Sequence, residues 1–251
     1  MAQDQSEGLT EDRLQPLFVT TRWSVVLSAR DKASPDAAQA LETLCRTYWY
    51  PIYVLTRSLG HPRADAQDLT QEFFARLLAR DYLRVVQAER GRFRTFLRMA
   101  LKRFLANEWD RRRAQKRGGD QAQVPFDTAI AEQQFQSEPA AAFTPEHLYD
   151  RRWALALLAA AEARLENEYA AAGKAADLRQ LKPHLTARHG AIPYPALAAA
   201  LHTTEGAARV AVHRLRKRFR ELFRETIADT VSAPDELESE CRYVMEILSG
   251  S

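Results

Sequence analysis

The sequence predicts an all-α protein of two small helical domains joined by a linker, the second domain containing a helix-turn-helix. Apolar residues recur at three- and four-residue spacing along most of the 251 residues, and no run alternates as a half-buried strand does. Residues 118–144 lose that spacing and gain Gly, Gln and Pro, which is typical of a linker. Beyond them, a short apolar helix, a tight turn and a long basic helix follow one another.

The composition is that of an ordinary globular protein, with 46% hydrophobic and 27% charged residues. The first residues are polar and acidic, unlike a signal peptide, and no apolar run approaches the ~20 residues of a membrane span. Two cysteines are too few for a disulfide framework. We therefore expect a cytoplasmic protein with reduced thiols and no membrane partner.

The net charge of +3 conceals a strong segregation of charge along the chain. Residues 88–117 carry eleven Lys or Arg and three acids, a net +8, while residues 209–224 carry seven and one, a net +6. The remainder therefore sums to −11, and residues 118–150 hold six acids and no Lys or Arg. Two basic segments in an otherwise acidic chain indicate two contacts with one polyanion.

The first half of the chain predicts a tail followed by helices. Residues 1–16 are expected to form a disordered tail, because they are polar and lack helical periodicity. Residues 34–60 predict two helices, with Ser34 as an N-cap and Pro51 bending or restarting the second. A third helix is expected over residues 61–83.

The third helix carries acidic residues on one face. Asp65, Asp68 and Glu72 are three and four positions apart, so they share that face above an apolar stripe. Taken alone, the pattern fits a solvated acidic face, a protein-binding face or a carboxylate metal cluster. The metal cluster is disfavoured, because no His stands at ligand spacing.

The fourth helix, expected over residues 91–117, separates an apolar stripe from a basic face. Arg94, Arg98 and Lys102 are four positions apart on the basic face. A basic groove with aromatic side chains is what binding a single nucleic-acid strand requires, although core packing is the simpler role for each aromatic. The apolar stripe consists of Phe93, Phe96, Leu97, Ala100, Leu101, Phe104, Leu105 and Trp109.

The second domain opens with a long helix. Thr144 is the expected N-cap, Pro145 the first helical residue and Gly173 the stop signal. A further helix is expected over 174–187.

The stretch "YPALAAALHTTEGAARVAVHRLRKRF" then has the pattern of a helix-turn-helix. Thr204 is expected to cap the second helix of this pair, and the apolar positions of both helices face inward. The alternative is a basic amphipathic helix for an acidic partner or an anionic membrane. The outward side of the second helix carries Arg209, His213, Arg214, Arg216, Lys217 and Arg220.

Three segments, in this order, resemble extracytoplasmic-function (ECF) sigma factors of bacterial RNA polymerase. They are "DAQDLTQEFFARLL", "GRFRTFLRMALKRFLANEWDRRR" and the helix-turn-helix stretch. The resemblance implies a domain over 17–117 that binds core polymerase and the -10 element, an acidic linker over 118–144 and a -35-binding domain over 145–228. It leaves residues 229–251 as a C-terminal extension.

The resemblance also implies partners and site residues. The partners are core RNA polymerase, through the clamp coiled coil of its largest subunit and its flap, and promoter DNA, both duplex and melted non-template strand; an anti-sigma factor or other regulator is a further candidate. The implied polymerase contacts are Asp65, Asp68, Leu69, Gln71, Glu72 and Phe74. The implied -10 contacts are Arg94, Arg98, Lys102, Arg103, Asn107, Arg111, Arg112 and Arg113, with a pocket for a flipped base over 83–92. The implied -35 contacts are Thr204, Arg209, Val210, His213, Arg214, Arg216 and Lys217.

Two departures from the family pattern stand out. His202 and Thr203 replace the usual Gly and apolar residue of the turn, and His can reach left-handed geometry at modest cost. Residues 229–251 extend beyond the usual end, with five acids and one Arg from Asp235 to Glu246. They predict an amphipathic helix that either folds back on a basic face as an inhibitor or packs structurally.

Catalysis is not expected, because the chain has no nucleophile motif, no phosphate-binding glycine loop and no convincing histidine site. We therefore predict no enzyme activity, no cofactor and no metal. Two other functions stay open: a helix-turn-helix regulator that acts without polymerase, and an adaptor whose basic helices bind an acidic protein.

Overall fold

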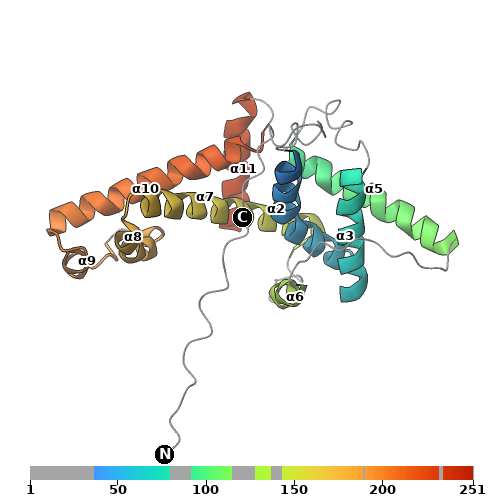
Figure 1. The fold of residues 1–251 in the computed structure, drawn as a ribbon, viewed down its shortest axis with the longest axis horizontal. Helices are drawn as coiled ribbons and strands as arrows, with labels where there is room; N and C mark the ends of the chain where they lie inside the picture. Colours follow the sequence, from blue (N-terminus) through green and yellow to red (C-terminus); the bar gives the residue numbers. More distant parts are fainter. Residues whose placement is uncertain are drawn as a thin grey trace, which may run out of the picture.

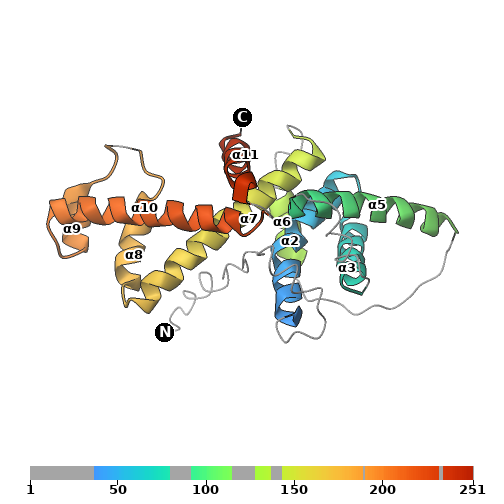
Figure 2. The ribbon, with the colours of Figure 1, turned by 90° about the horizontal axis from the view of Figure 1, so that it is seen from above.

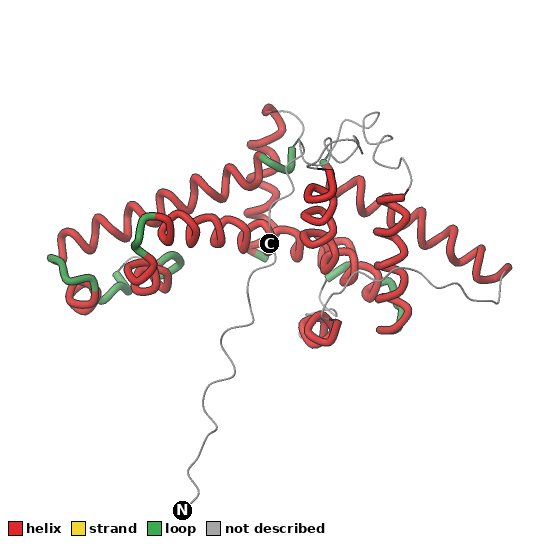
Figure 3. The backbone as a smooth tube through the Cα atoms, in the orientation of Figure 1, coloured by secondary structure: helices red, strands yellow, loops and turns green. Residues whose placement is uncertain are grey.

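The computed structural model describes residues 37–79, 92–114, 128–136, 143–188, 190–231 and 234–250. Within these ranges every regular element is helical and no strand occurs (Figures 1 and 3). The prediction of an all-α fold is therefore confirmed for this part of the chain. The expected tail over 1–16 and the expected base pocket, apart from Arg92, lie outside the described residues.

The helices follow one another with short connections wherever the connection is described. Their bounds are α2 (Ala37–Ser58), α3 (Arg63–Ala79), α5 (Phe93–Ala114), α6 (Thr128–Gln136), α7 (Pro145–Ala171), α8 (Ala175–Leu181), the 3-10 turn η1 (Lys182–His184), α9 (Tyr194–Ala200), α10 (Glu205–Ala228), the 3-10 turn η2 (Pro234–Glu236) and α11 (Leu237–Ser249).

Helix α7 passes through both hydrophobic cores of the described chain. Its 27 residues span about 40 Å at the usual rise of an α-helix. Helices α2, α3, α5 and α6 lie around its first half, whereas α8, α9 and α10 lie along its second half (Figures 1 and 2). The two cores therefore meet within α7, between Leu157 and Ala161.

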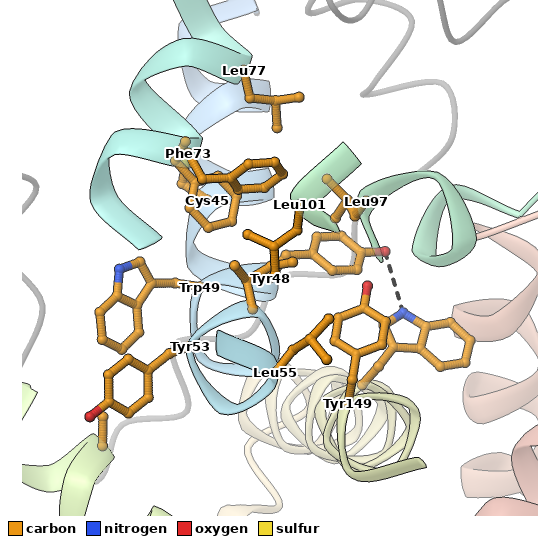
Figure 4. Packing of buried hydrophobic residues seen from close by; sticks show 14 of the residues in the cluster. Cys45, Tyr48, Trp49, Tyr53, Leu55, Phe73, Leu77, Leu97, Leu101 and Tyr149 are labelled. Carbon is orange, nitrogen blue, oxygen red and sulfur yellow. Dashed lines mark hydrogen bonds between the residues drawn. The ribbon is translucent and has the colours of Figure 1, made fainter. Parts of the chain in front are cut away.

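The first core is rich in aromatic side chains and includes residues from both ends of the chain. Tyr48 and Tyr53 of α2 and Tyr149 of α7 are each at most 1% exposed (Figure 4). The Trp153 indole donates a hydrogen bond to the Tyr48 hydroxyl over 3.4 Å. Val244 of α11 is fully buried in the same core. Because burying one large apolar side chain contributes about 1.5–3 kcal/mol, the buried side chains of α7 and α11 help to stabilise this core.

The start and stop signals of α7 are confirmed, whereas the helix expected over 174–187 is shorter, with α8 ending at Leu181. Thr144 caps α7, its hydroxyl accepting a hydrogen bond from the His147 amide over 3.2 Å, and Pro145 begins the helix. The helix ends at Ala171, and Gly173 follows with φ of 69°. This left-handed residue stops the helix as the sequence indicates.

The prediction of two helices over residues 34–60 is wrong. Helix α2 is a single 22-residue helix with Pro51 inside it. A proline in this position removes one helical hydrogen bond and costs stability. However, Tyr48, Ile52 and Tyr53 around it are fully buried, so packing keeps the helix continuous. The expected N-cap Ser34 lies outside the described residues.

The predicted linker contains a short helix, α6, which is packed against the rest of the chain. Ala131 and Glu132 are each 5% exposed, and Arg57 of α2 pairs with Glu132, its Nη2 lying 2.8 Å from Oε1. The Arg57 guanidinium also lies over the Phe135 ring, 4.7 Å from its centre. Helix α6 is therefore fastened to α2, and part of the predicted linker belongs to the first core.

Candidate nucleic-acid and polymerase interfaces

Helices α9 (Tyr194–Ala200) and α10 (Glu205–Ala228) pack against each other across a short turn. Leu197 and Ala198 of α9 and Ala208 and Val212 of α10 are buried against one another in the second core. Thr204 caps α10, accepting a hydrogen bond from the Ala207 amide over 3.2 Å. Small alanines at the crossing allow the two helices to approach closely, which fixes the direction in which α10 leaves the turn.

The turn between α9 and α10 depends on left-handed geometry at His202. This residue has φ of 50°, and it is the non-glycine residue with positive φ in the described part of the chain. Its amide bonds to the Ala199 carbonyl over 3.1 Å, and the next amide, of Thr203, bonds to Ala198 over 2.9 Å. The expectation that His202 adopts the conformation of the usual Gly is confirmed.

The first turns of α10 expose the side chains expected to contact the -35 element. Val210 is 48% exposed, which is unusual for a large apolar residue, and His213, Arg214 and Lys217 are exposed as well. Arg209 lies over the Tyr194 ring at 4.1 Å from its centre. A cation held on an aromatic face keeps a defined direction, so Tyr194 positions a side chain expected to contact a base.

Arg216 differs from its neighbours because its guanidinium hydrogen-bonds to backbone atoms of another segment of the chain. Its Nη2 donates to the carbonyl oxygen of His184 over 2.7 Å and also bonds to that of Ala187. The guanidinium thereby ties the segment after α8 to α10 and is only partly exposed. The sequence pattern places it on the outward face, but its hydrogen bonds are to backbone atoms about thirty positions earlier.

Acidic residues from α7 and α11 pair with the basic face of α5, burying Arg94 and leaving Lys102 49% exposed. Arg94 is 4% exposed, with Nη1 2.9 Å from Asp150 Oδ1 and Nε 2.9 Å from Glu240 Oε1. Arg98 Nη1 lies 3.1 Å from the other Asp150 oxygen. Lys102 Nζ lies 2.5 Å from Glu146 Oε1. Each of the three expected strand contacts therefore has an acidic partner within the chain.

Burial alone would disfavour the charge on Arg94, but its neighbours reverse that effect. Desolvation lowers the pKa of the guanidinium, whereas the hydrogen bonds and charge of Glu240 and the charge of Asp150 raise it, so the net pKa lies above its usual value. Arg94 is therefore charged, and its charge is neutralised by Glu240 and Asp150 of the same chain. Sequence spacing could not reveal this, because its partners stand 56 and 146 positions away.

The remaining expected -10 contacts lie further along α5. Arg103 and Asn107 are exposed, beyond the part of the helix that the acidic residues cover. Arg111, Arg112 and Arg113 belong to the last turn of α5, and their side chains lie outside the described atoms. The exposed end of α5 and its buried beginning are thus different surfaces.

The expected polymerase-binding residues of α3 divide into two groups. Asp68 is exposed, and Asp65, Gln71 and Glu72 are partly exposed. Leu69 and Phe74 are each 2% exposed and belong to the first core. The surface of α3 therefore carries carboxylate and amide side chains, with Glu72 paired to Arg76 of the same helix, while its apolar side contacts α2 and α5.

Among the described residues, no group of three or more His, Cys, Asp or Glu is arranged to hold a metal ion. In the same ranges, no helix combines the length and apolar character needed to cross a membrane. The chain matches no protein-family model, no curated protein and no solved structure.

Proposed function

We propose that this chain is an ECF-type sigma factor, which acts in the cytoplasm, binds core RNA polymerase and directs promoter recognition, DNA melting and transcription initiation. In this proposal α9, the turn and α10 form a helix-turn-helix that reads the -35 element. Helix α5 contacts the -10 element, and α3 contacts the polymerase. The two cores correspond to the two promoter-binding domains, which share α7.

The exposed basic start of α10 carries the proposal. A recognition helix needs its first turns free to enter the major groove, with Arg and Lys reaching bases and phosphates. Arg209, His213, Arg214 and Lys217 are exposed on those turns, behind a short helix and a tight turn. The segregation of +6 onto residues 209–224 of an otherwise acidic chain supports contact with a polyanion.

The acidic surface of α3 supports the polymerase contact. Asp68 is exposed, and Asp65 and Glu72 lie on the same helix three and four residues away. This surface is complementary to a basic partner, and such complementarity mainly increases the rate and selectivity of association. Since Leu69 and Phe74 are buried, the proposed contact depends on the carboxylates and Gln71.

Footprinting with the purified chain and core polymerase tests the role of α10. Arg209→Ala and Arg214→Ala should each weaken binding by about 1–3 kcal/mol, with relaxed preference at particular bases of the -35 element. Arg179→Ala, which removes an exposed arginine of α8 outside the proposed DNA contacts, is the matched control and should leave the footprint unchanged. A footprint that does not respond to either arginine variant would refute this role.

A helix-turn-helix regulator that acts without polymerase is the second candidate. The burial of Leu69 and Phe74 favours it, because it removes the apolar part of the expected polymerase contact. A core-binding assay separates the two. Co-elution with core polymerase that Asp68→Arg abolishes supports a sigma factor, whereas duplex binding without co-elution supports the regulator.

A further inference from the structure

The C-terminal helix α11 is fastened across the beginning of α5. Val244 and Ile247 are buried in the first core, while Tyr243 and Leu248 pack against its edge. Figures 1 and 2 show α11 crossing α7 near the middle of the molecule. The helix is thus seated by apolar contacts, and this seat brings its acidic residues to α5.

Glu240 is the central contact between α11 and α5. It is 1% exposed, with one oxygen 2.9 Å from Arg94 Nε and the other 2.6 Å from Arg92 Nε. Arg92 also donates to the Ser239 hydroxyl over 3.0 Å. One carboxylate on α11 therefore neutralises two arginines at the start of the basic helix.

Tyr243 of α11 also covers Arg94, whose guanidinium lies over this ring and, at 5.1 Å, over the Trp153 ring of α7. The Tyr243 ring centre is 4.0 Å from the guanidinium carbon, and its hydroxyl donates to Asp150 over 2.6 Å. Burial and the hydrogen bond to Asp150 raise the pKa of this hydroxyl, so it stays protonated as a donor. Arg94 consequently has carboxylates in its plane and an aromatic ring on its face.

This arrangement reproduces the contacts that an arginine makes with a nucleic-acid strand. Phosphate oxygens bind a guanidinium in its plane, and a base stacks on its face. In this chain, Glu240 and Asp150 take the place of the phosphate oxygens, and Tyr243 takes the place of the base. A strand cannot reach Arg94 while these groups remain, because Arg94 is 4% exposed.

We propose that α11 is an internal mimic of a nucleic-acid strand, which occupies the start of α5 and must leave before that surface binds DNA. This inference rests on the proposed function, in which α5 contacts the melted -10 strand. The acidic start of α7, with Asp150 and Glu146, forms the fixed half of the cover. Helix α11 forms the other half, which must leave before the surface of α5 is free.

An exposed ion pair between α10 and α11 can be changed by mutation without altering the core. Arg224 of α10 bonds to Glu238 of α11, and both side chains are more than half exposed. Arg224→Glu and Glu238→Arg each replace this attraction by repulsion. The double variant restores an attraction of the same kind. The first variant lowers the net charge by two and the second raises it by two, so simple electrostatics predicts opposite effects on DNA binding.

The test measures the affinity of the full chain for a single-stranded 20-mer of mixed sequence by fluorescence anisotropy. If α11 is a removable mimic, both single variants bind the 20-mer at least about twofold more tightly than the unmodified chain does. The double variant then returns to the original affinity. Opposite changes in the two single variants, or no change in either, overturn the inference.

A second variant strengthens the test at the buried contact. Glu240→Gln keeps the size of the side chain but removes the charge that neutralises Arg92 and Arg94, and it should also increase affinity for the 20-mer. Binding of duplex DNA, and its loss in Arg209→Ala, reports on the proposed function separately. Duplex binding that persists while the α11 variants leave strand affinity unchanged refutes the mimic alone; loss of all DNA binding refutes the proposed function.

Discussion

Arg94 and Asp150 form a buried ion pair that joins α5 to α7, with Nη1 2.9 Å from Oδ1 and each side chain 4% exposed. Arg94 is one of the residues expected to bind DNA, and Asp150 belongs to α7, the long helix shared by both cores. Because Asp150 also contacts Arg98 and the Tyr243 hydroxyl, one carboxylate connects three elements of the fold. The stability of the molecule and the accessibility of its basic helix are therefore linked.

Asp150→Ala should destabilise the fold by about 3 kcal/mol. The change leaves the buried Arg94 with fewer acceptors, and removing one partner of a buried charge pair is costly. Urea unfolding followed by circular dichroism measures the effect. Asp68→Ala, at an exposed position of α3, is the control and should stay within about 0.5 kcal/mol of the unmodified chain. A loss below about 1 kcal/mol for Asp150→Ala would show that Glu240 alone satisfies Arg94.

The pair between Arg57 and Glu132 should make stability depend on pH. The hydrogen bond from Arg57 lowers the pKa of Glu132 below its usual 4.5, and the Tyr53 hydroxyl adds a further bond. A lowered carboxyl pKa contributes stability above the unfolded pKa, and this contribution is lost as the pH falls through the folded pKa. Glu132→Gln should therefore cost about 1–2 kcal/mol at pH 7, with the gap closing toward pH 3. A gap that is equal at both pH values would contradict this account.

His202→Gly should stabilise the second core. The left-handed φ of 50° strains a residue with a side chain, and glycine removes that strain at the cost of greater freedom in the unfolded chain. We expect a net gain of about 0.5–1 kcal/mol in the free energy of unfolding. His202→Val should lower stability, because a β-branched residue tolerates this region poorly. Thermal unfolding of both variants measures the difference, and equal stabilities would show that the turn relaxes.

Arg216→Ala and Arg214→Ala should separate structure from recognition. Arg216 holds two backbone carbonyls, so its removal should cost about 1–2 kcal/mol of stability. Arg214 is exposed, so its removal should leave stability unchanged and weaken DNA binding. Unfolding curves and duplex anisotropy on both variants test the distinction. Equal stability of the two variants would contradict the structural role of Arg216.

Local features of the fold were predictable because they depend on neighbouring residues. Thr144 and Thr204 cap helices through amides three positions away, and His202 adopts the geometry that its place in the turn requires. Leu97 and Leu101 are buried as the apolar spacing of α5 indicates. In each case, the signal and its consequence lie within a few residues of one another.

The features that sequence reasoning missed depend on long-range packing. The partners of Arg94 are far away in the sequence, and no local pattern marks Asp150 or Glu240 as buried charges. Likewise, Pro51 indicates a break, but the aromatic core around it keeps α2 continuous. The sequence offered two roles for residues 229–251, packing structurally or covering a basic face. Helix α11 does both, since Val244 lies in the core and Glu240 contacts α5.

Transcription in vitro from a library of random DNA sequences tests the central proposal most directly. Purified core RNA polymerase with this chain should yield transcripts whose templates share two short elements at a fixed spacing. Core polymerase alone should not, and a chain carrying both Arg209→Ala and Arg214→Ala should lose the upstream element. If the chain does not bind core polymerase, or adds no promoter-specific transcripts, it is not a sigma factor.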